Sequence, residues 1–320
     1  MARRTRSGPK RSYKIPVALA LVLLLIVIIY YLFTSSGLAT SSALNGTSAA
    51  SSVLNDLNNV SPNTLATVGS GAAGITSPTS TTTATTAAPS PLTLNGKPEV
   101  LYIGAEYCPF CAAERWALIT ALDKFGTFTG LEYMQSASSP EVYPDTSTFT
   151  FVNANYTSSY IAFVSYEQKD RNELALQTPT VNATDLMSRY DNAGSIPFID
   201  YGNQYIQVGS QYTPPILRVG QNANGNPYNW TDIASQLSTP TSVFALNIDG
   251  AANRIISIIC KIDGGSPASV CSQSFASTAS FIRSSPSGSS QLLVSDAVLT
   301  TQAPPAAAAR SAPSRLSSWD

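Results

Sequence analysis

Residues 99–111, Glu-Val-Leu-Tyr-Ile-Gly-Ala-Glu-Tyr-Cys-Pro-Phe-Cys, decide the fold of this chain. Their first six residues, 99–104, form an apolar run of the kind found in buried parallel strands. Residues 108–125 then change to a helical spacing of apolar side chains, and residues 131–136 read as a second strand. Strand, helix and strand in this order predict a βαβ unit with a parallel sheet, and therefore an α/β fold.

Two cysteines, Cys108 and Cys111, stand where the predicted helix begins. Unpaired amide groups and the helix dipole favour a thiolate at the first position, and the second lies one turn deeper, within reach of a disulfide. We therefore predict that Cys108 is an exposed nucleophile and Cys111 the buried resolving thiol of an exchange reaction. Glu106 is either a proton relay for this pair or an ordinary surface acid, while Glu114 and Arg115 are interpreted as solvated helix residues.

Two motifs together resemble those of the thioredoxin superfamily. Residues 105–111 are similar to its active-site segment, and residues 194–199, Gly-Ser-Ile-Pro-Phe-Ile, are similar to its cis-proline loop. The resemblance implies that Pro197 is a cis proline packed across from the cysteine pair. It also implies that Ile196 presents its backbone to a substrate peptide.

The chain departs from the superfamily pattern in two ways. Pro109 and Phe110, which the resemblance assigns to substrate binding together with Ile196, carry no charged or imidazole group to stabilise a thiolate. A strongly oxidising redox potential is therefore not implied. About 60 residues separate Met134 from Gly194, which implies a thioredoxin-like fold with an insertion, and we expect substrate specificity to lie there.

The stretch 94–271 is also similar to an uncharacterised exported family of thermoacidophilic archaea. That resemblance implies a fold and a compartment but no activity. Within the stretch, residues 196–209 predict a hairpin that turns at Gly202-Asn203, and residues 229–237 and 243–261 predict helices. The low-charge, histidine-free composition would suit an acidic medium because few groups titrate.

A basic head and an apolar stretch occupy the N-terminus. Six of the chain's 18 basic residues fall within residues 1–14, ahead of every acidic residue, and residues 15–33 carry no charge. At about 1.5 Å per residue, this apolar segment can cross the roughly 30 Å core of a bilayer. The positive-inside rule places the head in the cytoplasm and the rest of the chain outside the membrane. A cleaved signal peptide is the alternative, and it implies the same export.

Composition divides the exported part into three regions. Residues 34–93, which are rich in Ser and Thr, predict a disordered stalk, residues 94–275 the thioredoxin-like domain, and residues 276–320 a mostly disordered tail. Asn-x-Ser/Thr sequons in the exported part permit N-glycosylation. They lie at Asn45, Asn59, Asn155, Asn182 and Asn229.

Charge and composition exclude several classes of protein. Beyond the basic head the chain is acidic overall, so it lacks the basic stripe that a nucleic-acid-binding protein needs to neutralise phosphates. The chain has no histidine, which excludes histidine-dependent catalysis. We expect no cofactor and no metal ion. The expected partners are exported proteins that carry thiols or disulfides, membrane lipid along residues 15–33, and an unidentified redox partner.

Cys260 and Cys271 are predicted to form a structural disulfide, which their spacing and an oxidising compartment both permit. A shuttle role with the first cysteine pair, and a zinc site built from all four cysteines, are the alternatives. Taken together, these patterns predict a membrane-anchored, extracytoplasmic thiol–disulfide oxidoreductase or isomerase that acts on exported proteins. A non-catalytic surface binding module and a zinc-stabilised module are the alternative functions.

Overall fold

The computed structural model describes residues 24–25, 41–82, 88–218 and 228–276. The predicted head, the predicted span apart from Leu24 and Leu25, and the predicted tail beyond Ala276 lie outside the described residues. Within the described part, no helix is both long enough and apolar enough to cross a bilayer. The membrane anchor therefore stays a prediction.

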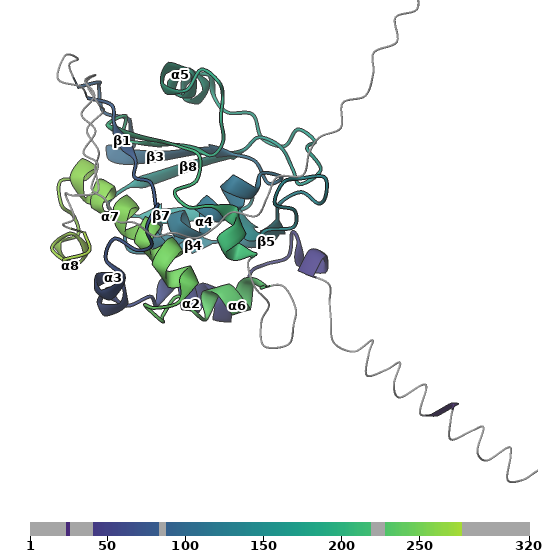
Figure 1. The fold of residues 1–320 in the computed structure, drawn as a ribbon. Coiled ribbons are helices and arrows are strands. Elements are labelled where there is room, and N and C mark those ends of the chain that lie inside the picture. The colour runs from purple at the N-terminus through teal and green to yellow at the C-terminus, as the bar shows by residue number, and fades with distance from the viewer. Residues whose placement is uncertain (1–23, 26–40, 83–87, 219–227, 277–320) are drawn as a thin grey trace, which may run out of the picture. The chain divides into compact units, whose positions relative to one another are not determined.

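A mixed β-sheet lies at the centre of the described structure (Figure 1). Its strands are β1 (Thr79–Ser80), β10 (Tyr205–Val208), β9 (Phe198–Tyr201), β3 (Lys97–Gly104), β8 (Ala162–Glu167) and the short β2 (Thr93–Leu94). The central strand β3 pairs parallel with β8 and antiparallel with β9 and β2. Two antiparallel pairs stand apart from this sheet: β4 (Gly126–Thr129) with β7 (Asn155–Ser158), and β5 (Glu132–Gln135) with β6 (Ser147–Thr150).

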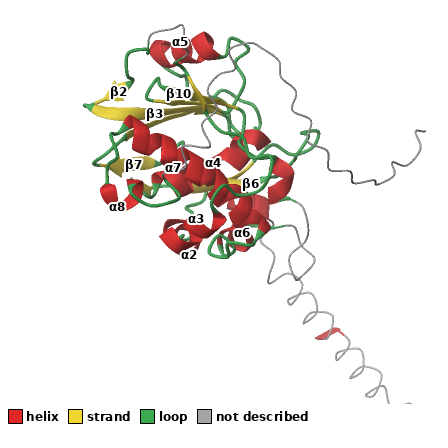
Figure 2. Ribbon diagram, turned by 60° about the vertical axis from the view of Figure 1, so that its left-hand side comes forward, coloured by secondary structure: helices red, strands yellow, loops and turns green. Residues whose placement is uncertain are grey.

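Helices cover both faces of the sheet (Figure 2). The helical elements are η1 (Ser41–Leu44), α2 (Ser51–Asn58), α3 (Pro62–Val68), α4 (Pro109–Leu122), α5 (Val181–Tyr190), η2 (Pro214–Leu217), α6 (Trp230–Ala234), η3 (Ala245–Asp249), α7 (Gly250–Ile262) and α8 (Ala268–Cys271). Side chains alternate along β3, so Leu101 and Ile103 pack toward α5, while Val100 and Tyr102 face the main core with α4 and α7. The predicted α/β class is confirmed, with a mixed rather than a wholly parallel sheet.

The parallel partner of β3 differs from the prediction. Residues 131–136 do contain a strand, β5, but it pairs antiparallel with β6, and β8 takes the place beside β3. The βαβ unit therefore runs from β3 through α4 to β8. Aromatic packing places β5 against β6 and α6 instead, because Tyr133 contacts Phe149 of β6 and Trp230 of α6.

Residues 41–82, predicted to be part of a disordered stalk, fold onto the domain instead. Helices α2 and α3 bury Val53, Leu57 and Leu65 completely in the main core. Asn253 of α7 donates from Nδ2 to the carbonyls of Leu65 at 2.9 Å and Gly69 at 2.8 Å, and so links the end of α3 to α7. The stalk prediction is wrong here because Val53 and Leu57, four residues apart, form an apolar helix face that an average over many Ser and Thr residues conceals.

Two features predicted from local signals are confirmed. Strands β9 and β10 form the hairpin, and Gly202 and Asn203 in its turn have φ angles of 64° and 56°, a region that favours these two residue types. Asn229 begins α6 with reciprocal hydrogen bonds: its side chain accepts from the amide of Asp232 at 3.1 Å, and the carboxylate of Asp232 accepts from the amide of Asn229 at 3.0 Å.

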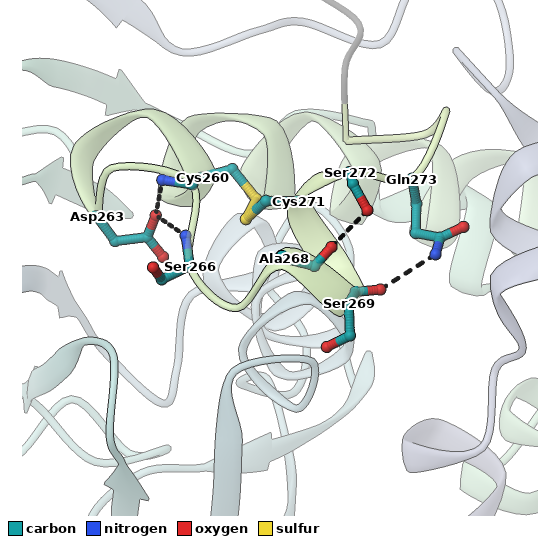
Figure 3. The surroundings of a disulfide bond; sticks show 9 residues. Cys260, Asp263, Ser266, Ala268, Ser269, Cys271, Ser272 and Gln273 are labelled. Atoms are coloured by element: carbon teal, nitrogen blue, oxygen red, sulfur yellow. Dashed lines mark hydrogen bonds between the residues drawn. A yellow bond between two sulfur atoms is a disulfide. The ribbon is translucent and has the colours of Figure 1, made fainter.

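Cys260 of α7 and Cys271 of α8 form a disulfide (Figure 3). The predicted pairing is confirmed, and the zinc site built from all four cysteines is wrong because these two sulfurs are bonded to each other. The connecting loop is ordered by Asp263, whose Oδ1 accepts hydrogen bonds from the amides of Gly265 at 2.9 Å and Ser266 at 3.0 Å.

Replacing both Cys260 and Cys271 by alanine should lower the free energy of unfolding by about 2–4 kcal/mol, because the cross-link restricts the unfolded chain. Urea unfolding in a Cys108→Ser, Cys111→Ser background measures the effect of this disulfide alone. Reduction of the parent protein should give the same loss as the alanine pair. A variant as stable as its parent would contradict the structural role.

Candidate functional site

The cysteine pair lies at the junction between the central strand and α4. β3 ends at Gly104, a short turn follows, and Cys108 is the N-cap residue of α4, with Pro109 at the first helical position. The Sγ of Cys108 accepts a hydrogen bond from the amide of Cys111 at 3.2 Å. This sulfur therefore occupies the position where a helix N-terminus stabilises negative charge.

The two cysteines differ in exposure and in acidity, and both are reduced. Cys108 is 5% exposed and Cys111 is fully buried, so Cys108 is less open than the predicted exposed nucleophile. A hydrogen bond with the Cys111 side chain lowers the pKa of Cys108, and the backbone amides of Cys111 and Phe110 and the guanidinium of Arg115 act in the same direction. Burial raises the pKa of Cys111 well above its ordinary value.

The second motif meets the first across the site. The Ile196–Pro197 peptide bond is cis, as the resemblance implies. The carbonyl oxygen of Ile196 lies 3.8 Å from the Sγ of Cys108, which donates to it. The hairpin of β9 and β10 positions this loop, because β9 pairs with β3 and begins directly after Pro197. Two motifs 88 residues apart are therefore brought into contact at one sulfur atom.

Phe110, between the cysteines, is 38% exposed, and Pro109 is buried. The ring of Phe110 makes an edge-to-face contact with Tyr143 at 5.9 Å between centroids. It also lines a cavity of about 400 Å³ together with residues 73–76 and the loop 209–213. The segment that composition assigned to a stalk thus contributes a wall of the cavity beside the cysteine pair.

Glu106 is not a surface acid. Its side chain is 5% exposed and accepts a hydrogen bond from the Oγ1 of Thr150 at 2.6 Å. Burial raises the pKa of Glu106, and the hydrogen bond from Thr150 opposes that shift. The interpretation of Glu106 as an exposed residue is wrong, and a proton-relay role stays a prediction.

Glu114 and Arg115 are fully buried, so their interpretation as solvated residues is wrong. Glu114 accepts a hydrogen bond from the amide of Gln211 at 2.8 Å. Arg115 forms a two-point ion pair with Glu167 at the end of β8, with Nε–Oε1 at 2.9 Å and Nη2–Oε2 at 2.6 Å. The sequence of α4 does indicate the burial of these two residues. The helix is apolar on nearly every side, which is typical of a helix that is buried all round. Glu167 carried no such signal.

Among the described residues, no group of three or more His, Cys, Asp or Glu side chains is placed to hold a metal ion. The site consists of a reduced dithiol at the N-terminus of α4 and a cis-proline loop that contacts the first sulfur. The same helix also carries Arg115, which forms the buried ion pair with Glu167. This arrangement can perform sulfur exchange chemistry, which needs a nucleophilic thiolate and a second thiol nearby.

The fold and the site define the class of protein as a mixed α/β domain with a buried cysteine pair on its central βα junction. The chain belongs to the family described as "Domain of unknown function (DUF929)", whose profile matches residues 84–261. The match includes the cysteine pair, the cis-proline loop and Cys260. No curated protein and no solved structure gives a match to the chain.

Proposed function

We propose that this protein is a thioredoxin-like thiol–disulfide oxidoreductase that exchanges thiols and disulfides with exported polypeptides through Cys108 and Cys111. The observation that carries the proposal is the position of the Cys108 sulfur. It accepts the Cys111 amide at the start of α4 and lies 3.8 Å from the carbonyl of Ile196, beside a cis proline. A peptide that binds along this loop would present its own sulfur to Cys108.

The order of the elements supports a thioredoxin-like fold. A buried strand leads into the cysteine-bearing helix, the chain returns to a parallel strand, and an antiparallel hairpin follows the cis proline. The stretch between Met134 and Gly194, where the insertion is expected, contains β6, β7 and α5, in addition to β8 of the main sheet. The small sheets β4–β7 and β5–β6 would then be additions to the common core.

The chemistry follows from the acidity of the two thiols. The Cys108 thiolate attacks one sulfur of a substrate disulfide, a mixed disulfide forms, and the other substrate sulfur leaves as a thiolate that takes up a proton. Cys111 then loses its proton and attacks the Sγ of Cys108, which releases the second substrate thiol. Two electrons pass from the cysteine pair to the substrate, and the reverse sequence donates a disulfide.

The proposed location is the outer face of a membrane, with residues 15–33 as the anchor and the N-terminus in the cytoplasm. The Cys260–Cys271 disulfide supports export, because such bonds persist in oxidising compartments and are rare in the cytosol. Exported polypeptides are therefore the proposed substrates, and a separate thiol or disulfide carrier must restore the pair after each turnover.

A redox titration of the full chain tests the proposal. The protein is equilibrated with thiol buffers of graded potential, free thiols are alkylated, and modified cysteines are counted by mass. We expect Cys108 and Cys111 to titrate reversibly within about −120 to −270 mV. A Cys111→Ser variant should trap a mixed disulfide with a peptide disulfide, and Cys108→Ser should not. A pair reducible only below about −300 mV would refute the proposal.

One observation favours a second function, that of a non-catalytic binding module. Cys108 is only 5% exposed, whereas its neighbour Phe110 is 38% exposed beside the cavity. In this alternative the cysteine pair supports the fold, and Phe110 makes the contact with a partner. Failure of the Cys111→Ser variant to trap a peptide, with peptide binding that depends on Phe110, would favour this alternative.

A further inference from the structure

A buried cation is bound to the same turn that carries Cys108. The Nη2 of Arg115 donates to the carbonyl oxygen of Ala105 at 2.7 Å. That oxygen also accepts from the amide of Cys108 at 3.3 Å. Arg115 lies four residues after Cys111, one helical turn further along the same face of α4. The Arg115 side chain is therefore hydrogen-bonded to the turn before Cys108, and its helical position is one turn beyond Cys111.

The surroundings of this guanidinium leave part of it unpaired. Arg115 and Glu167 have side chains that are 0% exposed, and their two hydrogen bonds use only Nε and Nη2. The Nη1 of Arg115 has no hydrogen-bond partner among the described residues, and neither does the buried hydroxyl of Tyr102. The guanidinium carbon lies 5.8 Å from the centre of the Tyr102 ring. A permanent positive charge with a spare N–H group thus lies in a water-excluded region under the site.

We propose that Arg115 is a positioning residue that stabilises the thiolate forms of the cysteine pair, and that Glu167 limits this effect by neutralising part of its charge. The inference rests on the proposed exchange function and adds its electrostatic control. In a chain without histidine, an arginine one turn below the dithiol supplies the cation that the Pro109-Phe110 dipeptide lacks.

The charges around the cysteine pair support opposite roles for Arg115 and Glu167. Arg115 lowers the pKa of both cysteines, whereas Glu167 raises the pKa of Cys111. Tyr102 of β3 also interacts with both cysteines and with Arg115, and burial raises its pKa well above the usual value. Tyr107, beside Cys108, interacts with both cysteines as well, and burial raises its pKa. Because arginine does not lose its proton near neutral pH, its effect persists across the whole range in which the thiols titrate.

Opposite shifts in two variants of the full chain test the inference. Arg115→Met removes the cation, so the thiolate of Cys108 should be less stable and the equilibrium constant for reduction by glutathione should fall about tenfold, equivalent to about 30 mV. Glu167→Gln leaves Arg115 without its counter-charge, so the same constant should rise. Arg115→Lys keeps the charge and should restore most of the parent value. Ultraviolet absorbance of the thiolate against pH gives an independent reading of the Cys108 pKa.

Both substitutions break a buried ion pair and should destabilise the fold, which is why the sign of the redox change decides the outcome. Arg254→Met, which removes a buried arginine from a different helix, α7, is the matched control and should leave the glutathione constant unchanged. Shifts of the same sign for Arg115→Met and Glu167→Gln, or no shift in either, would overturn the inference. A parent protein that shows no reversible titration would instead refute the proposed function. If Arg115→Met does not fold, Glu167→Gln decides: a rise in the glutathione constant supports the inference, and no change or a fall overturns it.

Discussion

Replacing Leu57 and Leu65 by alanine together is expected to lower the free energy of unfolding by about 4–10 kcal/mol, because each buried Leu→Ala change costs about 2–5 kcal/mol. Both side chains are fully buried in the main core, on α2 and α3 respectively. Since domains of ordinary stability have only about 5–15 kcal/mol in total, the double variant should be largely unfolded at growth temperature. Urea unfolding followed by circular dichroism measures the loss.

Leu94→Ala provides the matched control for this prediction. Leu94 is 40% exposed on β2, so the same chemical change there should alter stability by less than about 1 kcal/mol. If the segment before residue 94 were a stalk, Leu57→Ala and Leu65→Ala would be as harmless as Leu94→Ala. Equal stabilities for the three variants would therefore contradict the packing of α2 and α3.

The second large effect is an increase in stability as the medium becomes acidic. Burial raises the pKa of Glu114 to about 7 and that of Asp200 to about 7, and it raises the pKa of Asp249 well above its ordinary value. The folded state then binds more protons than the unfolded state between about pH 4 and pH 7. The stability that these protonated carboxyl groups contribute to the folded state is fully present below about pH 4, and it is lost as the pH rises through about 7.

Glu114 alone should account for on the order of 3 kcal/mol of this change. Unfolding free energies measured from about pH 4 to about pH 8, with the cysteine pair held in one oxidation state, should therefore decrease with pH. Glu114→Gln should flatten the profile, and Glu173→Gln, at an exposed carboxylate, should leave it unchanged. A protein that loses stability on acidification would show that these carboxyl groups are ionised in the folded state.

Local signals in the sequence predicted much of the site and part of the fold. The cysteine pair, Pro197 and the hairpin after it follow short patterns in which each residue has its own conformational reason: a helix N-terminus, a proline and a glycine-asparagine turn. These local conformational preferences do not depend on how the rest of the chain folds. The structure therefore places Cys108 and Ile196 in contact, as the two motifs together imply.

The features that could not be predicted depend on contacts between distant residues. The antiparallel partner of β5 and the parallel partner of β3 are chosen by packing that no short window contains. Likewise, the ion pair between Arg115 and Glu167, 52 residues later, could not be predicted, because neither residue indicates its partner. The fold of residues 41–82 was not predicted for a different reason. The many Ser and Thr residues in this segment lower its average hydrophobicity, so the short apolar face of α2 does not stand out in the composition.

The hydrogen bond from Asn253 to the end of α3 joins residues 188 positions apart and so bears on the order in which the domain can fold. A chain is synthesised from its N-terminus, so α3 is made long before η3 and α7, on which it packs, and α2 is made long before α6. Leu57 and Leu65 are therefore fully covered only after these C-terminal helices have been made. The last part of the domain to be made therefore closes the core around the first, and a high contact order of this kind favours slow folding.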